Sequence, residues 1–513
     1  MPKLAVVDIG TNSIHMVLAE IESDGSYKIL DRFKDMTRLG DGTFQQKRLS
    51  QAAMSRGIEV LSNLTTLARN KGFSKIVMTA TSAVREAKNG GQFIEAVARH
   101  TRVRVRVVTG QEEARLIYLG IRHSMELTGT PSLMVDVGGG SVEIIAGTRD
   151  RLVGAQSLKL GAIRLKDQYL TKAPPSKSKL REFYHAIHQE LRKALEQLKL
   201  EEVDRIIASS GMAANLAEIV YLERTGRAIP QLNMSTLGLK EVRLVEERLA
   251  TSNIEKRKEI PGLDPRRVDT LLPATAVIRT ILELTGKKEV TISDKAIREG
   301  LIYDFIQKNK EKIQIEQEVA NVRLRNVISL ARRCQYPKTH SHHIANLATS
   351  FFDQTRNLHR LGEQEREWLE YAALLHDVGY VINPRQHHKH AYYLIKHSDL
   401  AGFTLEEIEI IANLARYHRR AHPGMQHQSY QSLSIQDQKK LKALSAILRI
   451  VDGLDRSHFS IVRDLEVRVG KVVTIKLNVT GDSELEVWTA RNRADLFEKI
   501  YKRKVQFVIT PIA

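Results

Sequence analysis

Two stretches far apart in the chain repeat one pattern of residues. Residues 5–19 read AVVDIGTNSIHMVLA, and residues 133–147 read LMVDVGGGSVEIIAG. Each has an apolar run with one aspartate, small turn residues, a serine and a second apolar run. The aligned pairs are Asp8 and Asp136, Gly10 and Gly138, Ser13 and Ser141, and His15 and Glu143. One such stretch is an ordinary hairpin, but two in matching register predict a duplicated unit.

The sequence around each copy alternates strand and helix signals. After the first copy, residues 50–72 have helical spacing that ends at a glycine, and residues 75–80 read as a buried strand. After the second copy, residues 205–211 read as a strand and turn, and residues 289–294 as a strand. This order predicts an α/β fold whose sheets are mainly internal and flanked by helices.

The length of the chain and the changes in residue pattern along it predict several domains. A chain of 513 residues is typical of about three or four domains. The charged stretch 308–325 reads as a polar helix and marks a boundary, and the pattern is helical from there to about residue 455. Near the end, residues 467–479 and 484–488 alternate like strands, and residues 493–504 read as a helix. The expected domains are 1–126, 127–305, a helical domain at 306–458 and a small α+β domain at 459–513.

Composition narrows the class of partner. The formal net charge is +19, which favours an anionic partner such as phosphate, nucleic acid or a lipid surface. Aromatic residues make up only 5% of the sequence, so we do not expect the protein to bind nucleic acid by stacking bases on aromatic side chains. No specific nucleic-acid partner is expected. Cys334 is the one cysteine, which excludes an internal disulfide and fits a reducing compartment. We find no signal peptide and no apolar run of membrane-spanning length, and expect a cytoplasmic protein without membrane contact.

The glycine-rich turn of the second copy is suited to phosphate. Glycines let backbone amides approach an anion, so Gly138–Ser141 offer amide donors and a hydroxyl. Asp136, at the strand end, can hold a water or a divalent cation, for which Mg²⁺ is the natural ion. In a strand of period two, Ser141 and Glu143 face the same side, so Glu143 can join Asp136 on the metal. A tight hairpin is the simpler interpretation for one copy alone, whereas the repeat and the paired acids favour phosphate chemistry.

Six motifs in order carry a resemblance to a known family. They are DIGTNSIH from Asp8, TATSAVREA from Thr79, TGQEEARL from Thr109, VDVGGGSVE from Val135, SSGM from Ser209 and SDKAIREG from Ser293. Together they resemble the exopolyphosphatase / guanosine pentaphosphate phosphatase family, within the superfamily of actin, the heat-shock chaperones and the sugar kinases. The resemblance implies two actin-like, ribonuclease H-like lobes that close on a cleft. Where the family usually reads Ser-Gly-Thr, this chain has methionine at Met212.

The same resemblance implies roles for individual residues. Glu113 is the implied catalytic carboxylate that orients or deprotonates the attacking water, and Arg85 neutralises the terminal phosphoryl group. The implied Mg²⁺ ligands are Asp8, Asp136 and Glu143. The implied phosphate-binding residues are Asn12, Ser13, Gly138, Gly139, Gly140, Ser141, Ser210 and Gly211. Neighbouring helical residues differ by about 100° in direction, so only one of Glu112 and Glu113 is expected to face the cleft. A solvated carboxylate at a helix start is the alternative interpretation of Glu113.

These roles predict an exopolyphosphatase that releases terminal orthophosphate from linear polyphosphate with Mg²⁺ and water. The main alternative is removal of the terminal phosphate of guanosine pentaphosphate. Two further classes stay open, an actin-like ATPase or sugar kinase and a non-catalytic sensor of alarmones or polyphosphate. A long repeating anion is expected to bind along a row of basic side chains, and the positive net charge is consistent with such a row. Family members are often dimers, so a homodimer is expected.

The helical segment is rich in histidine between residues 340 and 422. It resembles the HD phosphohydrolase superfamily, whose metal motif implies the candidate ligands His343, His376, Asp377, His390, His418 and Asp452. Imidazoles and carboxylates together suit Mn²⁺, Fe²⁺, Zn²⁺ or Ni²⁺. In the alternative interpretation, the helical domain only binds the substrate. The residues that would do so are Arg385, His387, His388, Lys389, Arg416, Arg419 and Arg420. Because the motif is complete, we expect metal binding rather than independent catalysis.

Overall fold

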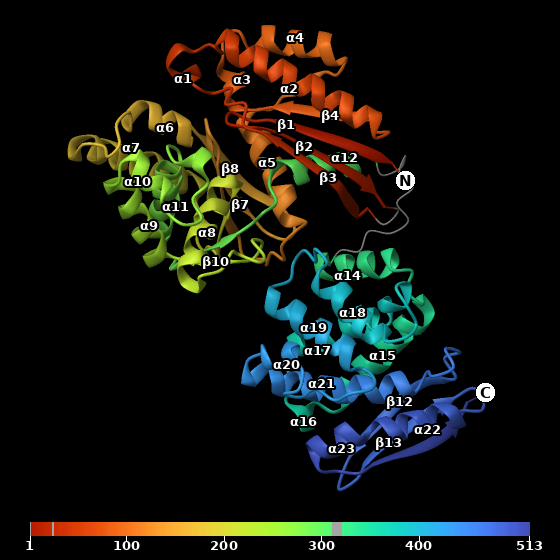
Figure 1. Ribbon diagram of the computed structural model, residues 1–513. Coiled ribbons are helices and arrows are strands. Elements are labelled where there is room, and N and C mark those ends of the chain that lie inside the picture. The colour runs from red at the N-terminus through yellow and green to blue at the C-terminus, as the bar shows by residue number, and fades with distance from the viewer. Residues whose placement is uncertain (1, 23–24, 310–320, 513) are drawn as a thin grey trace. The chain divides into compact units, whose positions relative to one another are not determined.

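The computed structural model describes residues 2–22, 25–309 and 321–512. The chain forms two compact units, Met1–Val319 and Ala320–Ala513, which Figure 1 shows from red to green and from green to blue. The sequence-based boundary lies earlier, after residue 305. Within the described residues, no helix is both long enough and apolar enough to cross a membrane.

The first unit contains two sheets that repeat one topology. The first sheet has the order β3-β2-β1-β4-β5 and the second β10-β11-β9-β6-β7-β8. The strands are β1 (Lys3–Ile9), β2 (Ile14–Ile21), β3 (Tyr27–Asp35), β4 (Lys75–Ala80), β5 (Val105–Val107), β6 (Ser132–Val137), β7 (Val142–Gly147), β8 (Leu152–Leu158), β9 (Ile206–Ser209), β10 (Thr236–Gly238) and β11 (Glu289–Ile292). In each sheet a parallel core carries two antiparallel strands at one edge, and in the second sheet β10 adds an antiparallel strand at the other edge. The predicted α/β class with two actin-like lobes is confirmed.

The strand register reproduces the alignment of the two sequence copies. Asp8 lies opposite His15 across β1 and β2. Asp136 lies opposite Glu143 across β6 and β7. The duplicated sequence therefore folds into a duplicated pair of strands, and the residues that differ between the copies occupy equivalent places.

The two turns between these strands close in the same way. The Gly10 N–H donates to the carbonyl oxygen of Ser13, and the Gly138 N–H donates to that of Ser141, both at 3.0 Å. A Cβ on Gly10 would lie 2.8 Å from the Ser13 oxygen, closer than carbon and oxygen approach. Glycine at this place therefore allows each turn to fold back tightly on itself.

Helices cover both sheets (Figure 1). They are α1 (Thr43–Gln46), α2 (Gln51–Asn70), α3 (Ser82–Glu86), α4 (Gly90–Thr101), α5 (Gly110–Arg122), α6 (Ala162–Tyr169), α7 (Lys177–Leu198), α8 (Ser210–Thr225), α9 (Leu239–Thr251), α10 (Ile254–Lys258), the 3₁₀ turn η1 (Pro265–Arg267), α11 (Leu271–Thr285) and α12 (Ile297–Lys308). The helix expected over 50–72 is α2, and Ser50 is its cap, since the Ser50 hydroxyl accepts from the Ala53 N–H.

Helix α12 packs against α5 and β1, although its residues follow the second sheet in sequence. Glycines make this helix crossing close. A Cβ on Gly300 would lie 1.8 Å from the carbonyl oxygen of Leu116, and one on Gly120 would lie 2.3 Å from that of Ala296. The range 127–305, predicted as the second lobe, therefore ends in a helix that covers the first.

The second unit is helical with a small sheet at its end. Its elements are α14 (Val322–Arg333), α15 (Lys338–Gln354), α16 (Arg356–His359), α17 (Glu363–Leu375), η2 (Val378–Val381), α18 (His387–Lys396), α19 (Leu405–Tyr417), α20 (Gln428–Gln431), α21 (Ile435–Gly453), β12 (Val462–Val469), β13 (Val473–Val479), α22 (Glu484–Arg493), α23 (Asp495–Tyr501) and β14 (Val505–Pro511). One hydrophobic core contains residues from both the helices and the sheet, for example Phe351, Ile475 and Phe497. The expected helix over 308–325 lies largely outside the described residues.

The prediction of a strand at residues 484–488 is wrong, because these residues begin helix α22. The Glu486 carboxylate is buried and accepts a hydrogen bond from the Ser457 N–H at 3.1 Å, while Leu485 and Trp488 are exposed. Alternating polar and apolar residues over so short a run fit one turn of helix as well as a strand. The third strand is instead β14, which pairs in parallel with β13.

Candidate functional site

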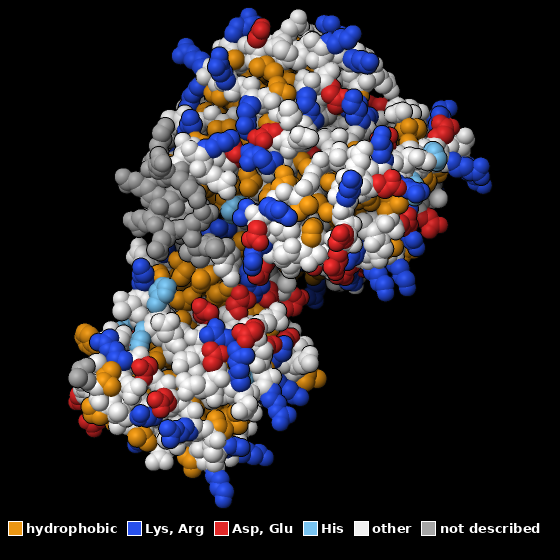
Figure 2. All heavy atoms as spheres, turned by 180° about the vertical axis from the view of Figure 1, so that it is seen from behind, with side chains coloured by type: hydrophobic (Ala, Val, Ile, Leu, Met, Phe, Trp, Pro, Cys, Tyr) orange, Lys and Arg blue, Asp and Glu red, His pale blue; other side chains and the backbone are white. Residues whose placement is uncertain are grey.

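Net charge by itself does not locate a site, since Lys and Arg side chains are scattered over the visible face of each unit (Figure 2). A cleft of about 460 Å³ in the first unit locates the candidate site. Of the residues that the sequence singled out, it is lined by Asp8, Asn12, Ser13, Glu113, Asp136, Gly138, Gly139, Gly140, Ser141, Ser210 and Gly211. Both duplicated turns therefore contribute to one cavity. Arg85 and Glu143 contact this set from behind the lining.

Glu113 lies in the first turn of α5 and is only 9% exposed. Its Oε2 accepts a hydrogen bond from Arg85 Nη1 at 2.8 Å, and the same nitrogen donates to the Val108 carbonyl oxygen at 2.8 Å. Burial raises the pKa of Glu113 to about 7, against the lowering effect of Arg85 and with further raising from Asp8 and Asp136. Such a carboxyl group exchanges a proton near neutral pH, as a general base requires.

The neighbouring Glu112 is engaged elsewhere. Its N–H donates to the hydroxyl of Thr109, which caps α5. Its carboxylate accepts from Arg115 Nε at 2.8 Å, and this contact holds the pKa of Glu112 below its usual range. Of the two adjacent acids, Glu113 therefore faces the cleft and Glu112 forms a surface ion pair.

Three further acids surround the cleft, of which Asp8 and Asp136 are half-buried and Glu143 is buried. Burial raises the pKa of Asp8 to about 7, and it raises the pKa of Asp136 as well. The Ser209 hydroxyl donates to Asp136. Glu143 is fully buried, with a pKa well above its usual range because of burial and then of Glu113, and its Oε1 accepts from Ser157 Oγ at 2.8 Å.

Two buried oxygens of this cluster, Asp8 Oδ1 and Glu143 Oε2, have no hydrogen-bond partner among the residues that the structure describes. A buried carboxylate oxygen without a donor is costly, and a cation bound to it removes that cost. An all-oxygen donor set of this kind fits Mg²⁺, which takes oxygen ligands and keeps several waters. The residues present therefore fit the magnesium ion that the sequence analysis expects.

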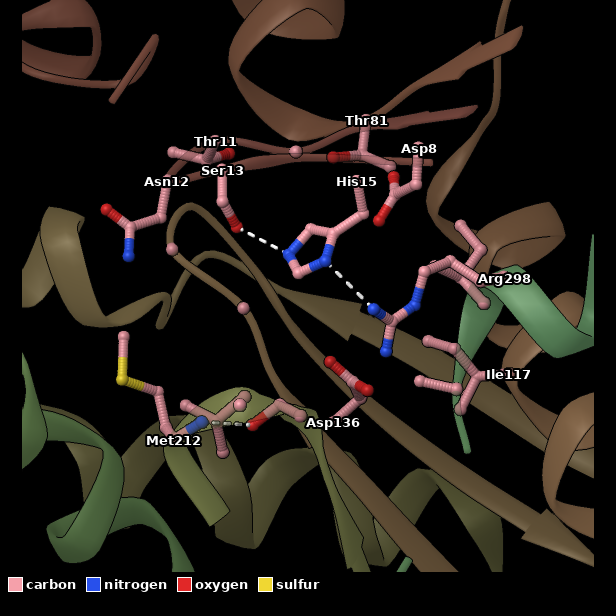
Figure 3. Close-up of a pocket in the computed structure, with 18 of the residues that line it drawn as sticks. Asp8, Thr11, Asn12, Ser13, His15, Thr81, Ile117, Asp136, Met212 and Arg298 are labelled. Atoms are coloured by element: carbon pink, nitrogen blue, oxygen red, sulfur yellow. Dashed lines mark hydrogen bonds between the residues drawn. The ribbon is translucent and has the colours of Figure 1, made fainter. Parts of the chain in front are cut away.

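His15 connects the first turn to helix α12 (Figure 3). Arg298 Nη1 donates to His15 Nδ1 at 2.8 Å, and His15 Nε2 lies 2.7 Å from Ser13 Oγ. Burial and then Arg298 lower the pKa of His15 to about 2, so the ring is neutral. With Nδ1 as the acceptor, the ring proton is on Nε2 and points to Ser13. The Ser13 hydroxyl proton is thereby free to donate into the cleft.

The second lobe contributes the start of helix α8. Ser210 has φ 91°, a left-handed conformation that is strained for a residue with a side chain, and its hydroxyl accepts from the N–H groups of Met212 and Ala213. A Cβ on Gly211 would lie 2.3 Å from the guanidinium of Arg267. The small residue lets Arg267 lie directly over the turn.

Sequence reasoning missed the cations of the cleft. Arg32, Lys34, Arg267 and Arg298 all line it. Arg298 stands within the motif SDKAIREG, so a signal was present, whereas Arg267 lies outside all six motifs. Arg32 and Lys34 alternate along β3, which places both on one face. Burial, and then the neighbouring arginines, lower the pKa of Lys34 to about 8.

The second unit brings together most of its candidate metal ligands, with two corrections. His376, Asp377 and His418 belong to two clusters of groups close enough to share metal ions, and Asp452 adjoins them. His343 is not a member, since its Nε2 contacts the Val462 carbonyl oxygen at 2.8 Å. His340, one turn earlier on α15, takes its place.

The second correction concerns helix α18. His390 does not belong to either cluster among the described residues, and the buried His387 takes its place. Residues three apart on a helix differ by about 60° in direction, so the packing of each helix decides which histidine faces inward.

Comparisons with known proteins agree with this architecture. The family model described as Ppx/GppA phosphatase family matches residues 16–309, and the model for Ppx/GppA phosphatase, domain III, matches residues 322–482. A solved structure of the Aquifex aeolicus family member is 26% identical with a TM-score of 0.53, and the alignment covers 60% of this chain and 98% of that one. An exopolyphosphatase from Cytophaga hutchinsonii is also 26% identical, with a TM-score of 0.56 and the same coverage. Since the first model alone spans more than half of the sequence, the chain belongs to the Ppx/GppA phosphatase family.

Proposed function

We propose that the chain is an exopolyphosphatase that releases terminal orthophosphate from linear polyphosphate in the cleft of the first unit. The observation that carries the proposal is the buried Glu113, aligned by Arg85 beside a cleft lined by cations. A repeating polyanion matches such a lining. The similar structure named as an exopolyphosphatase supports this substrate class.

In the proposed reaction, Glu113 accepts a proton from a water molecule as the water oxygen attacks the terminal phosphorus. The bond from that phosphorus to the bridging oxygen breaks, and the chain leaves one phosphate shorter. Arg85 keeps the Glu113 carboxylate directed at the water, since it also holds the Val108 carbonyl. Orthophosphate then carries the oxygen supplied by water.

The two turns hold the substrate in this scheme. Backbone N–H groups of Gly139 and Gly140 and the hydroxyls of Ser13 and Ser141 line the cleft and donate to phosphate oxygens. Asp8, Asp136 and Glu143 are the proposed ligands of Mg²⁺, which supplies charge neutralisation at the phosphoryl oxygens when bound. The glycines matter because a Cβ on Gly140 would lie 2.0 Å from the Ser82 hydroxyl.

A specific observation favours guanosine pentaphosphate as the second candidate substrate. Phe33, Met212 and Leu232 line the same cleft as the cations. Apolar and aromatic side chains beside phosphate-binding cations can hold a purine ring, which polyphosphate lacks. The terminal phosphate would be removed by the same Glu113 chemistry.

The deciding experiment measures orthophosphate release with Mg²⁺ from long-chain polyphosphate and from guanosine pentaphosphate. Turnover of polyphosphate that collapses in Glu113→Gln, with binding retained, supports the proposal. Preference for guanosine pentaphosphate selects the second candidate. Turnover that persists in Glu113→Gln and is lost in His376→Ala contradicts both, because it places the chemistry in the second unit.

A further inference from the structure

The glycine-rich turn of the second lobe has its carbonyl oxygens bound by helix α6. The carbonyl oxygens of Gly138 and Gly139 accept from backbone N–H groups at the start of this helix, at 2.9 and 2.8 Å. The carbonyl oxygen of Gly140 accepts from a side chain of the same helix, Arg164 Nε, at 2.9 Å. Helix α6 does not line the cleft as the structure describes it, so three consecutive carbonyl groups are turned away from the cleft.

The N–H groups of the same turn are left for a ligand. In a trans peptide the C=O group and the N–H group that follows it point in opposite directions. With the carbonyl oxygens bound to α6, the N–H groups of Gly139, Gly140 and Ser141 therefore point to the other side, where these residues line the cleft. None of the three N–H groups donates to another described residue. Successive free N–H groups of this kind form a concavity that binds anions.

The first lobe fixes the equivalent peptide by a different contact. Asn12 occupies the place of Gly140 in the duplicated pattern. Its carbonyl oxygen accepts from the backbone N–H of Arg38 at 2.9 Å. In the second lobe the corresponding contact comes from the Arg164 side chain, so a single substitution can remove it and leave the backbone of the turn unchanged.

Arg164 is held in place by the first lobe. Its Nη2 donates to Glu86 Oε1 at 2.6 Å, and its guanidinium carbon lies 4.0 Å from the centroid of the Phe44 ring. The arginine side chain is only 14% exposed, so these contacts are largely shielded from water. One guanidinium group therefore contacts the turn of the second lobe and two helices of the first, α1 and α3.

Helix α3 also carries Arg85, the residue that contacts Glu113. Adjacent residues on a helix differ by about 100° in direction, so Arg85 faces Glu113 while Glu86 faces Arg164. The Arg164 guanidinium therefore connects the glycine-rich turn to the helix that aligns the proposed base.

We propose that Arg164 is a positioning residue for phosphate binding in the cleft. Its Nε fixes the Gly140 peptide, so that the N–H of Ser141 stays directed into the cleft, and Glu86 fixes the guanidinium. Arg164 itself is not among the described residues that line the cleft, so it acts through the turn and does not touch the phosphate. The inference rests on the proposed function for the identity of the substrate, but any phosphate group in the cleft would meet the same turn.

The test is the dissociation constant of orthophosphate, measured by titration calorimetry on the full-length protein with Mg²⁺. We expect this constant to rise about 10-fold or more in Arg164→Ala, because a Gly140 peptide that is free to rotate no longer presents the N–H groups together. Lys159→Ala is the matched control. Lys159 Nζ lies 3.9 Å from Glu86 Oε2 and the side chain is 78% exposed, so this change removes a positive charge near the same acid. It should leave the dissociation constant at the wild-type value.

Chemical rescue separates positioning of the turn from a purely structural role. In Arg164→Ala, added methylguanidinium should restore part of the orthophosphate affinity, whereas methylammonium should not. Only the planar guanidinium can donate to Gly140 and to Glu86 at once. Glu86→Gln keeps Arg164 but removes the ion pair, and it should raise the dissociation constant by less than Arg164→Ala does. This second variant decides the question if circular dichroism shows that Arg164→Ala does not fold.

A dissociation constant that neither Arg164→Ala nor Glu86→Gln changes would overturn the inference, as would a wild-type protein that binds no orthophosphate. A lower melting temperature of Arg164→Ala with unchanged affinity would also overturn it, because the arginine would then only join the two lobes. Orthophosphate binding does not require turnover. Failure of the proposed exopolyphosphatase reaction, measured as no release from polyphosphate, is therefore distinguishable from failure of this inference.

Discussion

Arg85 donates to Glu113 Oε2 at 2.8 Å, and burial nevertheless raises the pKa of this carboxyl group to about 7. Desolvation therefore outweighs the attraction of a contacting guanidinium. The pair leaves Glu113 aligned and able to accept a proton near neutral pH. This combination of orientation and basicity distinguishes it from Glu112, the other acid on α5.

Replacing Glu113 with glutamine is expected to lower orthophosphate release by about 10²–10⁴-fold, because the amide keeps the shape and loses the base. Steady-state rates with Mg²⁺ and polyphosphate measure this. Glu112→Gln is the matched control, since Glu112 is adjacent and pairs with Arg115 at the surface. Equal losses in both variants would mean that Glu113 acts through the structure of α5 and not as a base.

The contribution of Asp8 and Glu113 to the stability of the metal-free protein should fall as the pH rises from about 4 to about 7. The pKa values of Asp8 and Glu113 rise to about 7 from ordinary values of 3.8 and 4.5, chiefly through burial. At these two groups the folded state then binds more protons than the unfolded state in this window, so raising the pH removes their contribution to stability. Melting curves across the window measure the effect.

Magnesium should reverse this loss, because a cation stabilises the ionised carboxylates. The increase in melting temperature on adding Mg²⁺ is expected to be larger at about pH 8 than at about pH 5. Asp8→Asn, which removes one of the titrating groups, should flatten the pH dependence of the metal-free protein. An increase with Mg²⁺ that is the same at both pH values would argue against these carboxylates as its ligands.

Arg298→Met should change the proton position on His15. The variant removes the N–H that donates to His15 Nδ1, so this nitrogen no longer has a fixed acceptor role. Nitrogen-15 NMR of the imidazole then should show a mixture of tautomers and a pKa above the present value of about 2. We expect kcat/KM to fall by about 10-fold or more, since the Ser13 hydroxyl loses its fixed direction.

Arg298→Lys is the companion variant, because it retains a charged donor in the cleft. It should restore part of the activity and more of the single tautomer than Arg298→Met. A wild-type tautomer in Arg298→Met would show that the surrounding strands, and not this arginine, orient His15.

Gly300→Ala should destabilise the first unit by at least about 3 kcal/mol, because the new methyl group would meet the Leu116 carbonyl and separate α12 from α5. Gly91→Ala in helix α4 is the control, since no atom of the described residues beyond its own chain neighbours and helix backbone lies within 4 Å of its Cβ position. That change should be neutral or stabilise by about 0.5 kcal/mol. Melting temperatures of the two variants compare the sites directly, and similar values would contradict the close helix crossing.

Local sequence was sufficient for the duplicated strand pairs. In a hairpin the turn length sets the register, so Asp8 and His15 had to face each other once the turn was recognised, and Asp136 and Glu143 likewise. The choice of Glu113 over Glu112 needed only the helical rotation and the motif around them. The α/β class followed from the order of strand and helix signals.

Other features were decided by contacts between distant segments. Residues 484–488 became a helix because Glu486 and Val487 find buried partners there. Helix α12 joined the first sheet because glycines let it approach α5. The residues of each segment do not show by themselves which distant segment they contact.

The histidines of the second unit show most clearly which features the sequence determines and which the tertiary structure decides. The sequence by itself determined that this region holds enough imidazoles and aspartates for metal ions. It did not determine that His340 and His387 face inward while His343 and His390 do not. Histidines one turn apart have the same local pattern, and only the packing of α15 and α18 against the rest of the unit orients one of each pair toward Asp377.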